Sequence, residues 1–424
     1  MRHKIALLAA APLLLITAEA QALSFGTFDP RSMAMGGTGV AAGTSANAHY
    51  YNPALLAAAR EGEDFSLELP VIGVRVADPD DLESSLQDFQ DARYIEEFSD
   101  AVDAFNASSQ SFAVKALDPN LGGRVVNAAD ALVDALPTLS NKALEGDANV
   151  GIVVGVPGDT WGVSVSVTGR AVGGGLLFVS PDDIANFKAI IAGLQSGNPA
   201  GIVDAANNLI DFADQQVLES KLRGRGAAIA EFGVSVAREF TLGGQDVAFG
   251  VTPKYVQVST FDYEVTVETA EISIDEGKKS YNNINLDLGA ASRFDNGWVA
   301  GLVIKNLLAK SYTTVNNNEI KIEPQIRAGI AYQWQSAMLA ADLDLTKNDS
   351  TGFDTPTRFL SVGGEWNIFR LLQLRLGYRY NLEDSDTSSY AAGFGLSPFG
   401  VHIDLAAVGN DREIGAGLQL GFRF

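Results

Sequence analysis

The sequence predicts an all-β membrane protein: a single antiparallel transmembrane β-barrel of about fourteen strands, with an N-terminal hatch and helical inserts in its outer loops. Three observations support this prediction. The chain begins with an export signal, much of it alternates apolar and polar residues with a period of two, and the connections between strands alternate between short and long.

The first residues have the three parts of a secretory signal peptide. A basic region at 2–4 is followed by an apolar run at 5–16 and by the small-x-small motif Ala20-Gln21-Ala22. An apolar run this short, with these flanks, is typical of a signal peptide rather than of a spanning helix. We therefore expect residues 1–22 to be removed. No later stretch has the roughly 20 apolar residues that a transmembrane helix needs, so entry into a bilayer requires strands.

Composition excludes several kinds of site. Cysteine is absent, which removes disulfides, Cys metal ligands and thiol nucleophiles. Only His49 and His402 follow the expected signal peptide, so we expect no metal site, no cofactor and no catalytic role. The net charge of -22 argues against nucleic acid as a partner. Residues 78–148 alone hold 15 acids against 4 bases, which predicts a solvated surface or, as the alternative, a docking surface for cations or a basic partner.

Period-2 alternation defines the strands. In the stretch 372–380 the apolar set is Leu372, Leu374, Leu376, Tyr378 and Tyr380, and it alternates with Gln373, Arg375, Gly377 and Arg379. A soluble β-sandwich alternates in the same way. What favours a barrel is that charge recurs on the second face of strand after strand, at lengths near the ~9–11 residues of a tilted spanning strand. The side chains predicted to face the lumen are Arg327, Glu365, Arg375 and Arg379.

The connections indicate the topology. Tight turns are expected at 157–160, 242–245, 295–297, 334–336, 367–370 and 398–400, and longer connections at 78–148, 172–225, 271–279, 307–318, 347–356, 383–387 and 410–412. This alternation gives fourteen strands in a barrel domain at 61–424, with strands expected at 320–332 and, unusually long, at 246–272. The connections 78–148 and 172–225 carry helical periodicity, including a helix expected at 199–215.

Two further features agree with an outer-membrane barrel. The four tryptophans, Trp161, Trp298, Trp334 and Trp366, all fall beside tight turns, as in an aromatic girdle at one membrane interface. The terminal alternation ends in Phe424, which predicts a signal for the barrel-assembly machinery; an ordinary last strand is the alternative. We therefore expect the protein in the outer membrane of a Gram-negative bacterium, in contact with its lipid.

Residues 23–60 are rich in Gly and Ala and are predicted to form the hatch. The run Gly36-Gly37-Thr38-Gly39 is not a phosphate loop, because no Lys-Ser/Thr follows it; glycine there permits tight backbone packing. The segment from Phe28 to Ala41, followed by Tyr50-Tyr51-Asn52-Pro53-Ala54, resembles the hatch of the long-chain fatty-acid transporter superfamily. In that superfamily a plug with an Asn-Pro-Ala signature closes a fourteen-stranded barrel. The resemblance implies hatch or gating roles for Gly36, Gly37, Gly39, Asn52, Pro53 and Ala54.

Within that group, the start Leu23-Ser24-Phe25-Gly26 and the Arg-Ser-Met-Ala-Met-Gly-Gly run most resemble the conjugal transfer TraF family of barrel type, and not the thioredoxin-like protein of the same name. One function hypothesis is a hatch-gated channel or transporter for hydrophobic small molecules. Another is a structural or interaction component of a surface or conjugal transfer apparatus, which would use the acidic helical inserts. The third is a barrel hydrolase built on His402 and Asp404, but two polar residues facing a lumen are ordinary.

Overall fold

The computed structural model describes residues 25–27, 29–57, 64–195, 219–266, 277–348, 352–353, 355–369 and 371–423. The expected signal peptide, the helix expected at 199–215 and Phe424 lie outside the described residues.

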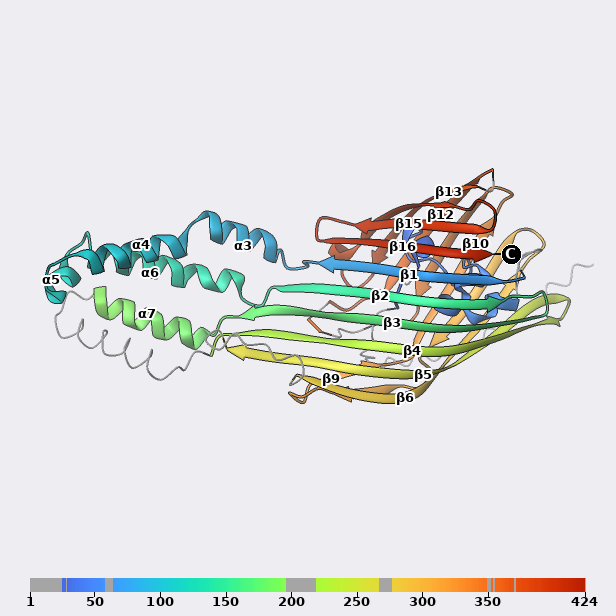
Figure 1. The fold of residues 1–424 in the computed structure, drawn as a ribbon, viewed down its shortest axis with the longest axis horizontal. Coiled ribbons are helices and arrows are strands. Elements are labelled where there is room, and N and C mark those ends of the chain that lie inside the picture. The colour runs from blue at the N-terminus through green and yellow to red at the C-terminus, as the bar shows by residue number, and fades with distance from the viewer. Residues whose placement is uncertain are drawn as a thin grey trace, which may run out of the picture.

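Fourteen antiparallel strands form a closed barrel, which confirms the predicted fold (Figure 1). The chain-order neighbours pair with one another, and β1 pairs with β16 to close the ring. The barrel strands are β1 (Ser66–Ala77), β2 (Ala143–Val156), β3 (Trp161–Phe178), β4 (Lys221–Leu242), β5 (Gln245–Thr266), β6 (Lys278–Arg293), β7 (Trp298–Lys305), β10 (Gln325–Gln333), β11 (Ala337–Asp344), β12 (Phe359–Ile368), β13 (Leu372–Asn381), β14 (Ser389–Leu396), β15 (Val401–Gly409) and β16 (Glu413–Arg423).

The alternation places apolar side chains on the outside. Val150, Ile152, Val154 and Val156 of β2 are 40–56% exposed, whereas Val153 between them is buried. All tight turns lie at one end of the barrel and all long connections at the other, and we call these the short-turn end and the long-loop end. The four tryptophans are 41–56% exposed, each beside a tight turn. An outer surface of this kind suits lipid, and the exposed rings lie together at one rim.

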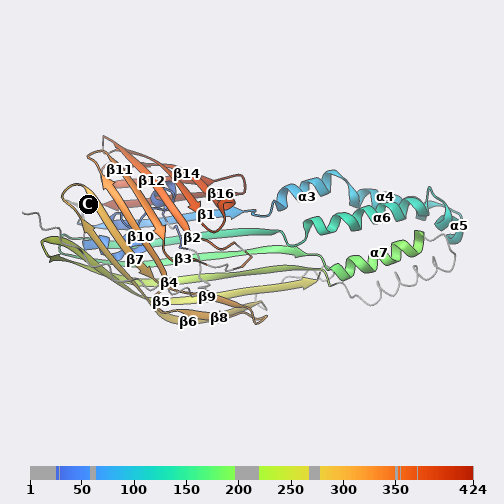
Figure 2. The same cartoon turned by 180° about the vertical axis from the view of Figure 1, so that it is seen from behind.

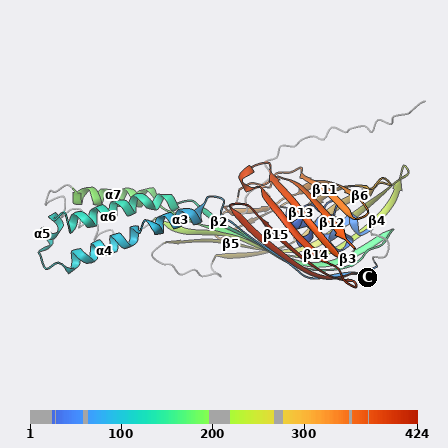
Figure 3. The same ribbon diagram turned by 90° about the horizontal axis from the view of Figure 1, so that it is seen from above.

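The wall is higher on one side than on the other. β3, β4 and β5 have 18, 22 and 22 residues, about twice what crossing a bilayer requires. Strands β12–β15 are shorter, and Figure 3 shows them inclined to the long axis of the molecule. Strands β2, β3 and β4 extend farther than predicted, with β2 starting at Ala143 rather than 149, β3 continuing to Phe178 and β4 starting at Lys221. Beyond the membrane the outer face has no need to be apolar, so the period-2 signal disappears before the strand does.

An elongated helical extension continues from the high wall (Figures 1 and 2). It consists of α3 (Leu82–Asp91), α4 (Tyr94–Ala107), α5 (Phe112–Leu117), α6 (Gly122–Ala135), η3 (Leu136–Leu139) and α7 (Pro181–Gln195). Its helices bury their own small clusters, one around Phe89 and Leu139 and one around Val133 and Ile191. Among the described helices, none combines the length and the apolar character needed to cross a membrane.

The single strand predicted at 320–332 is wrong. Residues Glu319–Ile322 form β9, which pairs with β8 (Lys310–Thr313) in a separate hairpin, and the barrel strand β10 begins only at Gln325. Pro324 separates the two strands, since proline cannot donate a hydrogen bond to a ladder. The hairpin packs Ile320 and Ile322 against inward-facing residues of β4 and β5, among them Val258. Ile320 and Ile322, which the alternation predicts on the lipid face, therefore lie inside the barrel.

Cysteine labelling tests the orientation on a background without native cysteine. Ser109, between α4 and α5, and Asn296, in the β6–β7 turn, are both exposed. We expect Ser109→Cys to react with a membrane-impermeant maleimide on intact cells, and Asn296→Cys to react only after the outer membrane has been opened, because short turns face the periplasm. The reverse pattern of labelling would show that the barrel has the opposite orientation.

Candidate functional site: hatch and vestibule

The hatch lies inside the barrel, where it appears in blue among the strands of Figure 1. It contains α1 (Pro30–Ala34), η1 (Ser45–Asn47), α2 (Ala48–Tyr51) and η2 (Pro53–Ala57), and every residue of these four elements is buried. Asp29 caps α1 by accepting a hydrogen bond from the Ser32 amide at 3.1 Å, and Pro30 follows at the first helical position, where its missing N–H costs nothing. Short helices of this kind let the segment turn repeatedly within the lumen.

The predicted glycines stand where the hatch backbone comes closest to other groups. Gly36 and Gly37 have φ of 69° and 92°, a left-handed conformation that favours glycine. A Cβ on Gly36 would lie 2.7 Å from the Tyr378 carbonyl oxygen of the wall. A Cβ on Gly39 would overlap the ring of Tyr51 within the hatch. A side chain at Gly36 or Gly39 would therefore force the hatch away from its present contacts, whereas at Gly37 the constraint is the left-handed backbone.

A second set of glycines lies on the barrel wall, and no sequence pattern identifies it. At each of these positions an added Cβ would come under 3.0 Å from hatch backbone atoms. The set comprises Gly363 and Gly377 beside Met35 and Gly36, Gly301 beside Val40, Gly250 beside Pro53 and Ala54, and Gly162 beside Leu56. In the sequence these glycines appear only as small residues at inward-facing positions of several strands. That pattern does not indicate contact with a hatch. The wall is thus shaped to the hatch at its backbone.

The Asn-Pro-Ala signature joins two parts of the hatch to the wall. The Asn52 side-chain amide donates to the Val40 carbonyl at 2.9 Å and to the Ala290 carbonyl of β6 at 3.0 Å. Its carbonyl oxygen accepts from the Ala54 amide at 3.1 Å, while Pro53 begins η2. A fully buried side-chain amide needs partners on both of its ends, and this geometry supplies them. Asn52 therefore holds the hatch chain against both itself and the barrel.

One of the predicted lumen residues, Glu365, forms an ion pair with the hatch, and a second, Arg375, belongs to the same network. Glu365 of β12 accepts from Arg31 of the hatch and from Arg375 of β13, each at 2.8 Å. Arg375 also reaches Asp404 of β15 at 2.5 Å, and Arg31 donates to the Ala42 carbonyl at 2.7 Å. An unpaired buried charge is strongly destabilising. Removing the hatch would take Arg31 out of this network and leave Glu365 with Arg375 as its guanidinium partner.

The other wall charges bind hatch backbone. Asp342 accepts from the amides of Gly39 at 2.8 Å and Val40 at 2.9 Å. Arg327 pairs with Asp344 at 2.5 Å and donates to the Gly37 carbonyl at 3.2 Å. Sequence alternation placed Arg327 on the lumen face but did not single out Asp342, because one acid on a polar face carries no distinct pattern. The glycine run of the hatch is thus held by charged groups of the wall.

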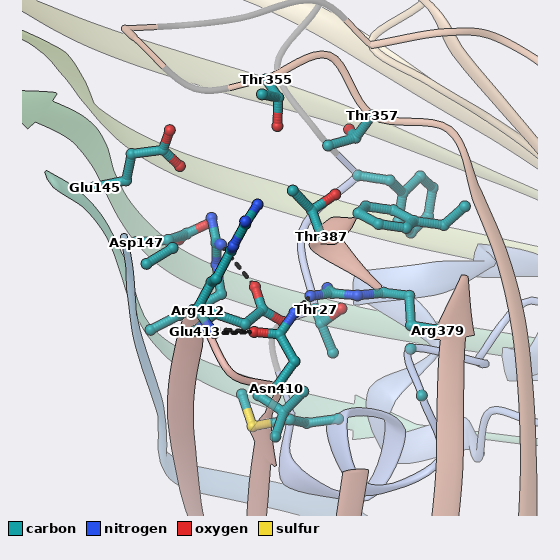
Figure 4. A pocket seen from close by; sticks show the side chains of 18 of the residues that line it. Thr27, Glu145, Asp147, Thr355, Thr357, Arg379, Thr387, Asn410, Arg412 and Glu413 are labelled. Atoms are coloured by element: carbon teal, nitrogen blue, oxygen red, sulfur yellow. Dashed lines mark hydrogen bonds and ion pairs between the residues drawn. The ribbon is translucent and has the colours of Figure 1, made fainter. Parts of the chain in front are cut away.

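Above the hatch, toward the long-loop end, is a cavity of about 90 Å³, which we call the vestibule (Figure 4). Its floor includes Phe25, Thr27 and Met33 of the hatch, and its walls carry charge from β1, β2, β3, β13, the β15–β16 connection and the start of β16. The charged residues that line it are Arg75, Glu145, Asp147, Arg170, Arg379, Arg412 and Glu413. Arg379, the fourth predicted lumen residue, belongs to this cavity rather than to the Glu365 network.

Neither histidine is in a catalytic arrangement. The His49 ring contacts the Ser235 hydroxyl at 2.9 Å and the Ser166 hydroxyl at 2.5 Å. Burial in the hatch lowers its pKa to about 3, with Lys305 adding repulsion, so the ring is neutral at ordinary pH. His402 lies 2.6 Å from Glu68 and 4.0 Å from Asp404. It belongs to the seam between β1, β15 and β16.

Comparison with known proteins adds a family and a fold. The family model described as F plasmid transfer operon, TraF, protein matches residues 49–344. No curated protein matches the sequence. Two deletion mutants of the monoaromatic hydrocarbon channel TodX superimpose with TM-scores of 0.51 each, at 13% and 11% identity; both cover 94% of this chain, which in turn covers 99% and 98% of them. The P. putida toluene transporter TodX gives 0.49 at 12% identity, with 94% and 99% covered.

The fit between hatch and wall can be tested with one methyl group. Gly377→Ala would place a Cβ against the backbone of Met35 and Gly36, and overpacking of this kind typically costs ~1–3 kcal/mol. We expect the barrel to assemble, shown by heat-dependent gel mobility, while the hatch becomes more sensitive to protease and the unfolding midpoint falls. Gly146→Ala in β2 is the matched control, because a Cβ there would meet nothing within 4 Å. Equal protease sensitivity of the two variants would contradict the tight fit.

Proposed function

The chain belongs to the family described as F plasmid transfer operon, TraF, protein, and from that premise we propose that it is a hatch-gated channel or transporter for hydrophobic small molecules. The observation that supports this proposal is the complementarity of hatch and wall. Glycines of the wall receive the hatch backbone, and Arg31, Glu365 and Asp342 hold it by charge. A closed barrel needs no interior plug for its own backbone hydrogen bonds, so a fitted plug indicates control of passage.

The gating assignment concerns six hatch residues and their wall contacts. Gly36 and Gly39 permit the close backbone approach, and Gly37 adopts a left-handed conformation between them. Asn52, Pro53 and Ala54 fasten the second half of the hatch. Passage requires some of these contacts to open. The vestibule on the long-loop side is where a solute from outside would first meet the hatch.

Apolar solutes are favoured by part of the vestibule lining. Phe25, Met33, Phe359 and Val408 contribute apolar surface to a cavity whose lining is otherwise largely polar or charged. The superimposed barrels are named as a monoaromatic hydrocarbon channel, and those names concern other proteins. A transport role without catalysis also agrees with the contact between His402 and Glu68, which holds that imidazole in a hydrogen bond at the seam of the barrel.

The helical extension supports a second candidate, an interaction component of a surface or conjugal transfer apparatus. It projects from the long-loop end in every view (Figures 1–3). Its outer faces carry many acids, and Ile95 is 60% exposed among them. Nothing in the hatch or vestibule requires such an extension, so the two roles can be separated by deletion.

Deleting residues 25–58 while retaining the export signal tests the gate. The barrel strands pair among themselves, so we expect assembly to continue and the unplugged lumen to conduct. Bilayer conductance of the purified protein and uptake of a bulky hydrophobic antibiotic by cells should both rise.

The matched control replaces residues 82–139 of the extension with a short Gly-Ser linker and keeps the hatch. Its conductance should equal that of the unmodified protein. If the hatch deletion assembles and conductance does not rise, the segment is not a gate and the interaction role becomes the better account.

A further inference from the structure

We propose that the vestibule is a binding site for a compact monocarboxylate, a small acid with an apolar body of roughly benzoate size. That a bound acid also passes through the barrel rests on the proposed function. The inference limits the expected solutes to small amphipathic acids. Binding itself requires only the cavity and its side chains.

The first argument is charge. The whole chain carries -22, yet the residues that line the vestibule include four arginines and three acids. Arg170 is paired with Asp147 at 2.5 Å, and Arg412 points to Asp81 and Asp386 at 3.2 and 3.5 Å. Of the lining charges this leaves Arg75 and Arg379 together with Glu145 and Glu413, so the guanidinium groups that an anion could reach are those of Arg75 and Arg379 beside their shared Glu413.

These two arginines share a single acid. Glu413 accepts from Arg75 Nη1 at 2.9 Å through one carboxylate oxygen and from Arg379 Nη2 at 3.1 Å through the other (Figure 4). The Nε of Arg379 has no hydrogen-bond partner among the described residues. A guanidinium presents five donors in a planar fork that matches a carboxylate. A second carboxylate beside Glu413 would use donors that are now idle.

The second argument is the surface beside the guanidinium. Arg379 lies over the ring of Phe359, 4.5 Å from its centroid, and Phe25 and Met33 lie on the hatch side of the same cavity. An anion bound to Arg379 would thus have apolar contacts for the rest of its body. Thr27 and Thr357 add hydroxyl groups near the same place.

The third argument is size. The vestibule has a volume of about 90 Å³, several times the ~10–15 Å³ of this measure that one water molecule needs. A small cavity of this kind favours a compact acid, and benzoate is therefore the probe of choice.

The test measures binding to the intact barrel in detergent by calorimetry, with benzoate and its neutral isostere benzamide as probes. We expect benzoate to bind at least tenfold more tightly than benzamide, and Arg379→Gln to lower the affinity for benzoate by about tenfold or more. Arg238→Gln is the matched control, because Arg238 lies over Trp161 near the short-turn end. Equal binding of the two probes, no binding of benzoate, or equal loss in both variants would overturn the proposal.

Glu413→Gln provides the opposite change. Removing the competing carboxylate should tighten benzoate binding severalfold, whereas a purely structural role of the cluster predicts a loss. Only variants that assemble, as shown by heat-dependent gel mobility, are compared. If one of them does not assemble, Arg75→Gln takes its place, and it should weaken the binding of benzoate. If benzoate binds and deletion of the hatch leaves the conductance unchanged, the binding site is supported and the channel function is refuted. Higher conductance without benzoate binding would do the reverse.

Discussion

The structure depends on one constraint: a charge inside the lumen must find a partner there. Burying an unpaired carboxylate or guanidinium costs several kcal/mol, and the inner wall carries many such groups. Part of the pairing is supplied by the hatch, whose Arg31 joins Glu365 and whose amides at Gly39 and Val40 join Asp342. The hatch is therefore part of the electrostatic balance of the barrel. A solute that moves it must offer replacements for these contacts, or the solvent must.

Close packing makes that balance specific. A charge–charge attraction alone tolerates a shift of an ångström, but a backbone pressed against Gly363 and Gly377 does not. The glycines determine where the hatch lies, and the ion pairs then hold it at that position. Both sets face inward because the strands alternate, so the same period-2 rule that exposes apolar residues to lipid also builds the hatch contacts.

The strand count, the alternation of turns and loops, and the lumen face of Arg327, Glu365, Arg375 and Arg379 follow from local pattern, which is why they could be predicted from the sequence. The partners could not be predicted. Asp342 binds residues about 300 positions away and the wall glycines contact residues more than 100 positions away, and a single sequence carries no signal of that proximity. The prediction of one strand at 320–332 failed for a related reason. Its apolar residues Ile320 and Ile322 do face a nonpolar surface, but that surface is the inside of β4 and β5 rather than lipid.

Charge also separates the two ends of the molecule. The acidic extension and the arginines of the vestibule lie in one chain, but screening at physiological salt limits their interaction to about 8 Å. α4 alone, with 14 residues, spans about 21 Å at 1.5 Å per residue. α4, α5 and α6 lie well away from the barrel (Figure 1), so the acids of these helices act only weakly on an anion bound at Arg379. The acidic extension can bind a basic partner while the lumen binds an anionic solute. A role in assembly and a role in solute passage are therefore physically compatible within this chain.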